Sequence, residues 1–162
     1  MPELPKTVEE AIELAIAAEI DANLTYLHLA KMTKKPESKS LFQNLARDEQ
    51  WHKEALEERY QAITQGKQPK SVSASIEGAV LRRKAKEDLA EMEILNLAIE
   101  AEIAAYGFYT GTAKMTDDAE TKQTFLRLAK DEQQHRELLE KEIQGRQGKP
   151  TDEMELDNWV RE

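Results

Sequence analysis

The chain of 162 residues contains no cysteine, and it has few glycine, proline and aromatic residues. Without cysteine it can form no disulfide, no thiolate metal site and no iron–sulfur cluster, so any metal must be bound by carboxylate and imidazole groups. No apolar run approaches the roughly 18 residues that a membrane span needs. The first residues lack the apolar segment of a secretory signal. We therefore expect a cytoplasmic protein that does not associate with membranes.

The charge of the chain is strongly unbalanced, with a formal net charge of −9. This acidity argues against nucleic acid and against an anionic membrane surface as partners. Charged residues make up 34% of the chain and aromatic residues only 6%. Such a composition, rich in Ala, Leu, Glu and Lys, is typical of long helices and predicts an all-α protein.

The second half of the chain repeats the first. Residues 15–61 align with residues 98–144 without a gap, and about half of the aligned residues are identical. The agreement continues through the intervening turn, where the segment from Ala30 to Thr33 returns as the segment from Ala113 to Thr116. Similar composition alone does not explain a gapless match of this kind. The repeat predicts two copies of a helical hairpin.

Helix signals divide each half into two long helices. Thr7 and Glu10 have the spacing of a capping box, and we expect helices over about 8–33, 37–65, 88–115 and 119–144. Pro36, Gly66 and Gly145 provide breaks. The connection between the two hairpins, over about residues 66–87, is long enough to run the length of a bundle. We predict one four-helix bundle, built from two antiparallel hairpins, over residues 1–147, followed by a tail over 148–162.

Each predicted apolar stripe carries acidic residues in its middle. An unpaired buried carboxylate is very costly, and no lysine or arginine occupies these stripes in both halves. Two divalent cations would balance four carboxylates and leave the histidines neutral. A lone Glu-x-x-His is usually surface decoration, but here two copies occur in register. The predicted metal ligands are Glu19, Glu49, His52, Glu102, Glu132 and His135.

The positions of these residues along the helix axes are consistent with a single site. Glu19 lies about 15 residues before the first turn and Glu49 about 15 residues after it, so both sit roughly 22 Å from that turn. Glu49 and His52, three residues apart, share one face of their helix. Four carboxylates and two imidazoles suit two Fe(II) ions per chain, with Mn or Zn as possible substitutes.

These motifs resemble the rubrerythrin branch of the ferritin-like superfamily over roughly residues 7–145. The resemblance lies in Glu19, Glu102 and the two segments Asp48–His52 and Asp131–His135. It implies a ferritin-like di-iron bundle and a homodimer. The chain lacks the four cysteines of an appended rubredoxin domain. It also has Ala105 where rubrerythrins carry an additional glutamate that is linked to iron movement during peroxide reduction.

The resemblance also suggests partners for the ligand histidines. In related di-iron proteins an aspartate before the ligand glutamate accepts the N–H of a histidine from the opposite half. We therefore expect Asp48 to pair with His135, and Asp131 to pair with His52. The alternative is that both aspartates are exposed and only make the helices soluble.

Two tyrosines are candidates for a catalytic role. Tyr26 and Tyr109 follow Glu19 and Glu102 by seven residues, about two turns along the same face. Their hydroxyl groups could bond a ligating carboxylate, or donate an electron or a proton. Packing in the core is the alternative interpretation.

The functional hypothesis is a di-iron oxidoreductase that reduces hydrogen peroxide, or O2, to water. Its electrons would come from a separate donor such as rubredoxin or ferredoxin, because the chain has no cysteine of its own. The main alternative is a ferroxidase that stores or detoxifies iron. A structural or adaptor bundle is disfavoured by the inward carboxylates.

Overall fold

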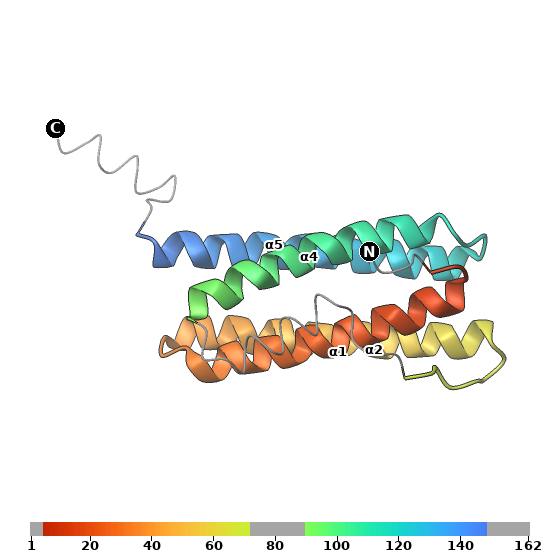
Figure 1. The fold of residues 1–162 in the computed structure, drawn as a ribbon, viewed down its shortest axis with the longest axis horizontal. Coiled ribbons are helices and arrows are strands. Elements are labelled where there is room, and N and C mark those ends of the chain that lie inside the picture. The colour runs from red at the N-terminus through yellow and green to blue at the C-terminus, as the bar shows by residue number, and fades with distance from the viewer. Residues whose placement is uncertain (1–4, 72–89, 149–162) are drawn as a thin grey trace.

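The computed structural model describes residues 5–71 and 90–148, and this part of the chain contains four helices and no strand (Figure 1). The predicted all-α architecture is confirmed. The helices pair within each half of the chain, α1 with α2 and α4 with α5, and the two hairpins meet through α1 with α4 and through α2 with α5. Their bounds are Val8–Met32 for α1, Pro36–Ile63 for α2, Glu91–Ala113 for α4 and Ala119–Arg146 for α5.

The helix starts follow the local signals. The Thr7 hydroxyl accepts the backbone N–H of Glu10 at 3.1 Å, as expected for the first helix. The Glu10 carboxylate in turn accepts the N–H of Lys6 at 2.9 Å. Pro36, which we expected to precede the second helix, is instead its first residue. Proline fits there because the first N–H of a helix has no partner within the helix.

One predicted helix end is wrong. We expected Gly145 to stop the last helix, but α5 continues to Arg146, and Gly148 takes the left-handed conformation at φ 66°. The Arg146 guanidinium donates to Glu142 at 3.0 Å and also to Glu91 at the start of α4. The bond to Glu91 joins α5 to α4 and gives the last turn a partner that a local pattern does not reveal.

The apolar core consists of two clusters related by the internal repeat. One contains Tyr26 and Phe42, and the other contains Tyr109 and Phe125. On α2 the first cluster ends at Ala46 and the second includes Leu56. The layer between them is the one that carries Glu49 and His52. The core therefore holds the polar residues between two dry regions.

Two predicted segments cannot be compared with the structure. Most of the crossover over 66–87 lies outside the described residues, and so does the tail beyond residue 148. The expected start of the third helix near residue 88 lies outside them as well. Among the described helices, none combines the length and the apolar character that crossing a membrane requires.

Candidate dimetal site

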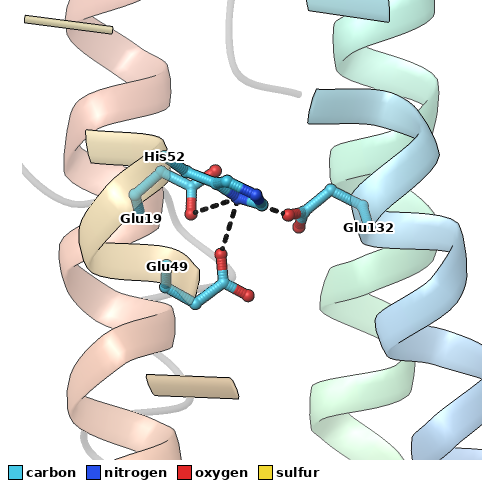
Figure 2. Close-up of side chains that lie close together, drawn as sticks. All are labelled: Glu19, Glu49, His52 and Glu132. Carbon is cyan, nitrogen blue, oxygen red and sulfur yellow. Dashed lines mark hydrogen bonds and ion pairs between the residues drawn. The ribbon is translucent and has the colours of Figure 1, made fainter. Parts of the chain in front are cut away.

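The layer between the two apolar clusters gathers the six predicted ligands at the centre of the bundle. All six side chains are buried, from Glu49 with no exposed surface to His52 at 4% exposure. Figure 2 shows one half of this layer, in which the carboxylates of Glu19, Glu49 and Glu132 surround the His52 ring. All four helices contribute, with Glu19 on α1, Glu49 and His52 on α2, Glu102 on α4, and Glu132 and His135 on α5.

The ligand atoms form two overlapping groups. Within each group the atoms lie within 4.8 Å of one another. Glu49 and Glu132 belong to both groups. The repeat did not reveal this sharing, because it assigns each candidate ligand to only one half of the chain. The two groups are Glu19, Glu49, His52 and Glu132, and Glu49, Glu102, Glu132 and His135. No other group of this kind occurs in the part of the chain that the structure describes.

Each histidine is oriented by an aspartate from the other hairpin. His52 Nε2 lies 3.1 Å from Asp131 Oδ2, and His135 Nε2 lies 3.1 Å from Asp48 Oδ2. These are the pairs expected from the sequence. A carboxylate can only accept a hydrogen bond, so Nε2 is the nitrogen that carries the proton and donates it. The other ring nitrogen, Nδ1, is thereby left facing the centre of the site.

The inward nitrogens point at several carboxylate oxygens. His52 Nδ1 lies 2.8 Å from Glu132 Oε1 and 3.2 Å from Glu49 Oε2. His135 Nδ1 lies 3.1 Å from Glu49 Oε1 and 3.6 Å from the nearer oxygen of Glu102. An unprotonated Nδ1 in this position would direct its lone pair at negative oxygens. Stability then requires either a proton on the nitrogen or a cation between the groups.

The electrostatics of the metal-free cluster favour the proton. Burial raises the pKa of Glu49 and of Glu132, and the neighbouring carboxylates raise both further. Burial opposes the charge of His135, but the carboxylates of Glu102 and Glu132 outweigh it and raise the pKa to about 9. The pKa of His52 is raised further, mainly by Glu132 and against the effect of burial. Without bound cations, protons on these groups would supply the balancing positive charge.

Burial also acts to raise the pKa of Glu102, but His135 outweighs it and lowers the pKa below its usual value. The second group therefore has a carboxylate that is ionised more readily than an ordinary glutamate.

The donor set fits metal ions. Glu19 Oε2 and Glu102 Oε2 are buried and accept no hydrogen bond. In the described residues, the ion pairs of the four glutamates all go to histidine and none goes to lysine or arginine. Four carboxylates with two imidazole nitrogens are suitable ligands for two divalent first-row cations. Such cations would supply partners for the two open oxygens.

The two tyrosines bond to glutamates across the halves of the chain. The Tyr26 hydroxyl donates to Glu102 Oε1, and the Tyr109 hydroxyl donates to Glu19 Oε1. Burial raises the pKa of both tyrosines, and the accepting carboxylates raise it further. Both hydroxyls therefore keep their protons. The sequence placed each tyrosine near the glutamate of its own helix, whereas the antiparallel packing of α1 and α4 brings it to the other one.

The sequence analysis missed a residue that holds α1 beside the site. Asn23, one turn after Glu19, donates its side-chain N–H to the backbone carbonyl of Ala46 on α2 at 2.7 Å. This bond crosses from one ligand-bearing helix to the other. Asn23 lies on the same stripe as Glu19, but its counterpart in the repeat is Tyr106. The repeat therefore offered no second polar residue at this position that would have indicated the bond.

The fold and the paired carboxylate–histidine groups define a ferritin-like helical bundle with a candidate dimetal site. The rubrerythrin family model matches residues 10–143, with a second match over residues 93–157. The chain belongs to the rubrerythrin family. No curated protein sequence matches it significantly.

Solved structures share the same architecture. A hypothetical protein from Pyrococcus furiosus is 25% identical with a TM-score of 0.67, over 85% of this chain and 88% of that one. The manganese catalase KatB from Anabaena is 21% identical with a TM-score of 0.68, over 94% and 78%. A dodecameric thioferritin from Bacteroides fragilis is 17% identical with a TM-score of 0.66, over 85% and 84%. The last two likenesses establish the fold alone.

Proposed function

We propose that this protein is a non-haem di-iron oxidoreductase that reduces hydrogen peroxide, or O2, to water with electrons from a separate donor. The observation that supports this most directly is the sharing of Glu49 and Glu132 between the two ligand groups. Shared carboxylates suit two metal ions held close together, rather than two independent sites. Membership of the rubrerythrin family supports the same class of chemistry.

The residues divide naturally into bridging and terminal ligands. Glu49 and Glu132 would bridge the two ions, and each ion would have one further glutamate and one histidine Nδ1. A pair of iron ions supplies the two electrons that cleavage of an O–O bond requires. Manganese or zinc could occupy the same ligands, because carboxylate and imidazole bind all three metals.

The surrounding residues would control orientation and protons. Asp48 and Asp131 hold the histidine rings through Nε2–H, which fixes Nδ1 toward the metal positions. The Tyr26 hydroxyl keeps its proton and donates it in a hydrogen bond to Glu102, and the Tyr109 hydroxyl does the same to Glu19. These two hydroxyls are the proton donors nearest to the terminal glutamates in the described structure. We assign them a role in positioning these glutamates and in transferring that proton.

The electrons would arrive from another protein. The chain has no cysteine with which to hold a rubredoxin-type or iron–sulfur centre. Rubredoxin or ferredoxin is the class of donor that we propose. We also propose that the protein acts as a homodimer.

A ferroxidase that stores or detoxifies iron is the second candidate. The observation that favours it is Ala105, which is half-buried on α4 where rubrerythrins have an additional glutamate. Without that carboxylate, the two halves offer the same set of ligand types. A symmetric site of this kind lacks the feature that the family links to peroxide reduction.

The test combines metal stoichiometry with oxidant preference. The metal-free protein is titrated anaerobically with Fe(II), and the proposal requires two irons per chain. The loaded protein is then mixed with peroxide and with O2 in parallel stopped-flow experiments. Oxidation that is about tenfold or more faster with peroxide supports the peroxidase. Faster reaction with O2 and continued turnover of added Fe(II) support the ferroxidase.

The matched control is Glu137→Gln, which removes an exposed carboxylate from α5 about one turn from Glu132. It should bind two irons with unchanged oxidation rates. A wild-type protein that holds less than one iron per chain would contradict the proposal as a whole.

A further inference from the structure

The outward side of α4 carries an exposed row formed by one large apolar residue and two glycines. Ile103 is 45% exposed there, and Gly107 and Gly111 are exposed as well. Spacings of four residues place these three in one row along the helix. Glu100 and Lys114, also exposed, lie at the two ends of this row. We call these five residues the α4 outer face.

The two glycines are not required by packing against residues 5–71 and 90–148. A Cβ added at Gly107 or at Gly111 would meet no atom of these described residues within 4 Å. Glycine inside a helix is less favourable than alanine by about 0.5–1 kcal/mol, so two of them weaken α4 with no gain inside the chain. The corresponding residues of α1 are Leu24 and His28. The glycines are therefore specific to the second half, where they permit the close approach of another helix.

The charges of the α4 outer face are complementary to those of the same face on a second copy of the chain rotated by 180°. Glu100 lies seven residues before Gly107, and Lys114 lies seven residues after it. If two copies of α4 cross antiparallel with Gly107 at the two-fold axis, Glu100 of one copy lies level with Lys114 of the other. Neither side chain forms an ion pair with another residue of the described ranges. Both charges are thus available to a partner.

The same two-fold rotation also places a large side chain opposite a glycine. Ile103 lies four residues before Gly107, and Gly111 lies four residues after it. Each Ile103 is then level with Gly111 of the other copy, where no side chain fills the space. A face that complements itself in charge and in size is what a two-fold interface between identical chains requires.

We propose that the α4 outer face is the contact between two copies of this chain, packed antiparallel about Gly107. Tyr106, which is 42% exposed beside the face, adds apolar area to the contact. A single helix row buries less than the roughly 1,600 Å² of a standard interface, so we expect a dimer that dissociates on dilution. This inference deepens the proposed homodimer but does not depend on the redox chemistry.

Sedimentation velocity over a concentration series tests the contact, with the metal-free and the iron-loaded protein measured separately. At high concentration the wild type should approach twice the chain mass of 18.5 kDa. Gly107→Leu should weaken dimerisation about tenfold or more, because the two leucines meet at the axis. Leucine also favours the helix, so the free chain stays folded. Unspecific adhesion through an apolar patch would instead become stronger in this variant.

Charge exchange tests the antiparallel register. Lys114→Glu should weaken the dimer about threefold to tenfold, because it brings two acidic groups together at each end. Adding Glu100→Lys to the same chain should restore the wild-type constant. The control is Lys31→Glu, which changes the exposed counterpart of Lys114 on α1 and should leave the dimer intact.

Three results would each overturn the proposal. One is a wild-type chain that stays monomeric up to about 0.5 mM, which would assign the face to a different protein. Another is stronger association of Gly107→Leu. The third is a double charge exchange that fails to restore the dimer. Because iron content is measured on the same samples, failure of the dimer remains distinguishable from failure of the proposed metal site.

Discussion

His52 Nε2 lies 3.1 Å from Asp131 Oδ2, across the boundary between the two hairpins. The contact joins α2 to α5 and at the same time selects the tautomer of a candidate metal ligand. His135 and Asp48 form the equivalent contact in the opposite direction. The internal repeat therefore appears in the structure as an exchange, in which each half orients the histidine of the other.

Removal of one aspartate should weaken metal binding. In Asp131→Ala the His52 ring loses the acceptor for Nε2–H, so Nδ1 is no longer held toward the site. Loss of such a partner typically costs 10- to 100-fold in metal affinity, and we expect about that loss for one of the two metals. Competition with a chelator of known affinity measures it. Asp117→Ala, an exposed residue of the turn before α5, is the control. Unchanged affinity in Asp131→Ala would contradict the orienting role.

Bridging and terminal ligands should differ in stoichiometry. Glu49→Gln removes a carboxylate that both groups share, and we expect it to lower the occupancy of both metals. Glu19→Gln removes a carboxylate of one group only, so about one metal per chain should remain. Metal analysis after anaerobic loading distinguishes the two outcomes, with circular dichroism to verify folding. Equal losses in both variants would mean that Glu49 is not shared.

The fold and the clustering of the six candidate ligands were largely predictable because both follow from periodicity. A gapless repeat fixed the two hairpins, and carboxylates on apolar stripes identified Glu19 and Glu102 together with the two Glu-x-x-His pairs. The spacing of one helix determines which residues share its face. It does not determine how two helices cross. For that reason the sharing of Glu49 and Glu132, and the tyrosine bonds across the halves, emerged only from the packed bundle.

The protonation of the site was not predictable for the same reason. An isolated histidine titrates near 6.5, and the sequence offers no way to count the carboxylates around it. In the bundle His52 and His135 face oxygens from three helices, which raises their pKa. The end of α5 shows the same limitation, because Arg146 is held by Glu91 from a helix that begins 55 residues earlier.

The metal-free protein should lose stability as the pH rises. The pKa of His135 is raised from 6.5 to about 9, and that of His52 is raised further. For His135 this contribution to stability is complete below pH 6.5 and is lost as the pH rises through about 9. The contribution of His52 declines over the same range and beyond it, because its pKa is raised further. The raised pKa of Glu49 and of Glu132 acts in the same direction. Between pH 6.5 and 9.5 we expect the Tm to fall by about 5 °C or more.

Bound metal should reverse this trend. Divalent cations replace the protons on Nδ1, so metal binding becomes tighter as the pH rises and loading at neutral pH releases protons. Calorimetric scans at matched ionic strength, with chelator and with metal, compare the two forms. A metal-free protein whose Tm rises between pH 6.5 and 9.5 would show that the histidines are not protonated in the cluster.

The tyrosine pair allows a test of positioning with an internal control. Tyr26→Phe removes the only hydroxyl that donates to Glu102 in the described structure, and leaves the ring in place within the apolar cluster. A hydrogen bond to a charged group contributes about 1.5–3 kcal/mol, so the metal-free protein should become less stable by roughly this amount. Tyr109→Phe should have a similar effect through Glu19. Tyr106→Phe, which changes a 42% exposed ring, should alter neither stability nor reactivity.

Reactivity separates a positioning role from mere packing. If the hydroxyl only packs, the loaded Tyr26→Phe protein reacts with peroxide at the wild-type rate once its stability is matched by temperature. If the hydroxyl positions Glu102 or supplies a proton, the rate falls and its pH profile changes, while the rate of Tyr106→Phe stays constant. We expect a decrease of about tenfold or more, typical of losing a positioned proton donor. Equal rates and equal pH profiles in all three proteins would remove Tyr26 from the mechanism and leave it as part of the core.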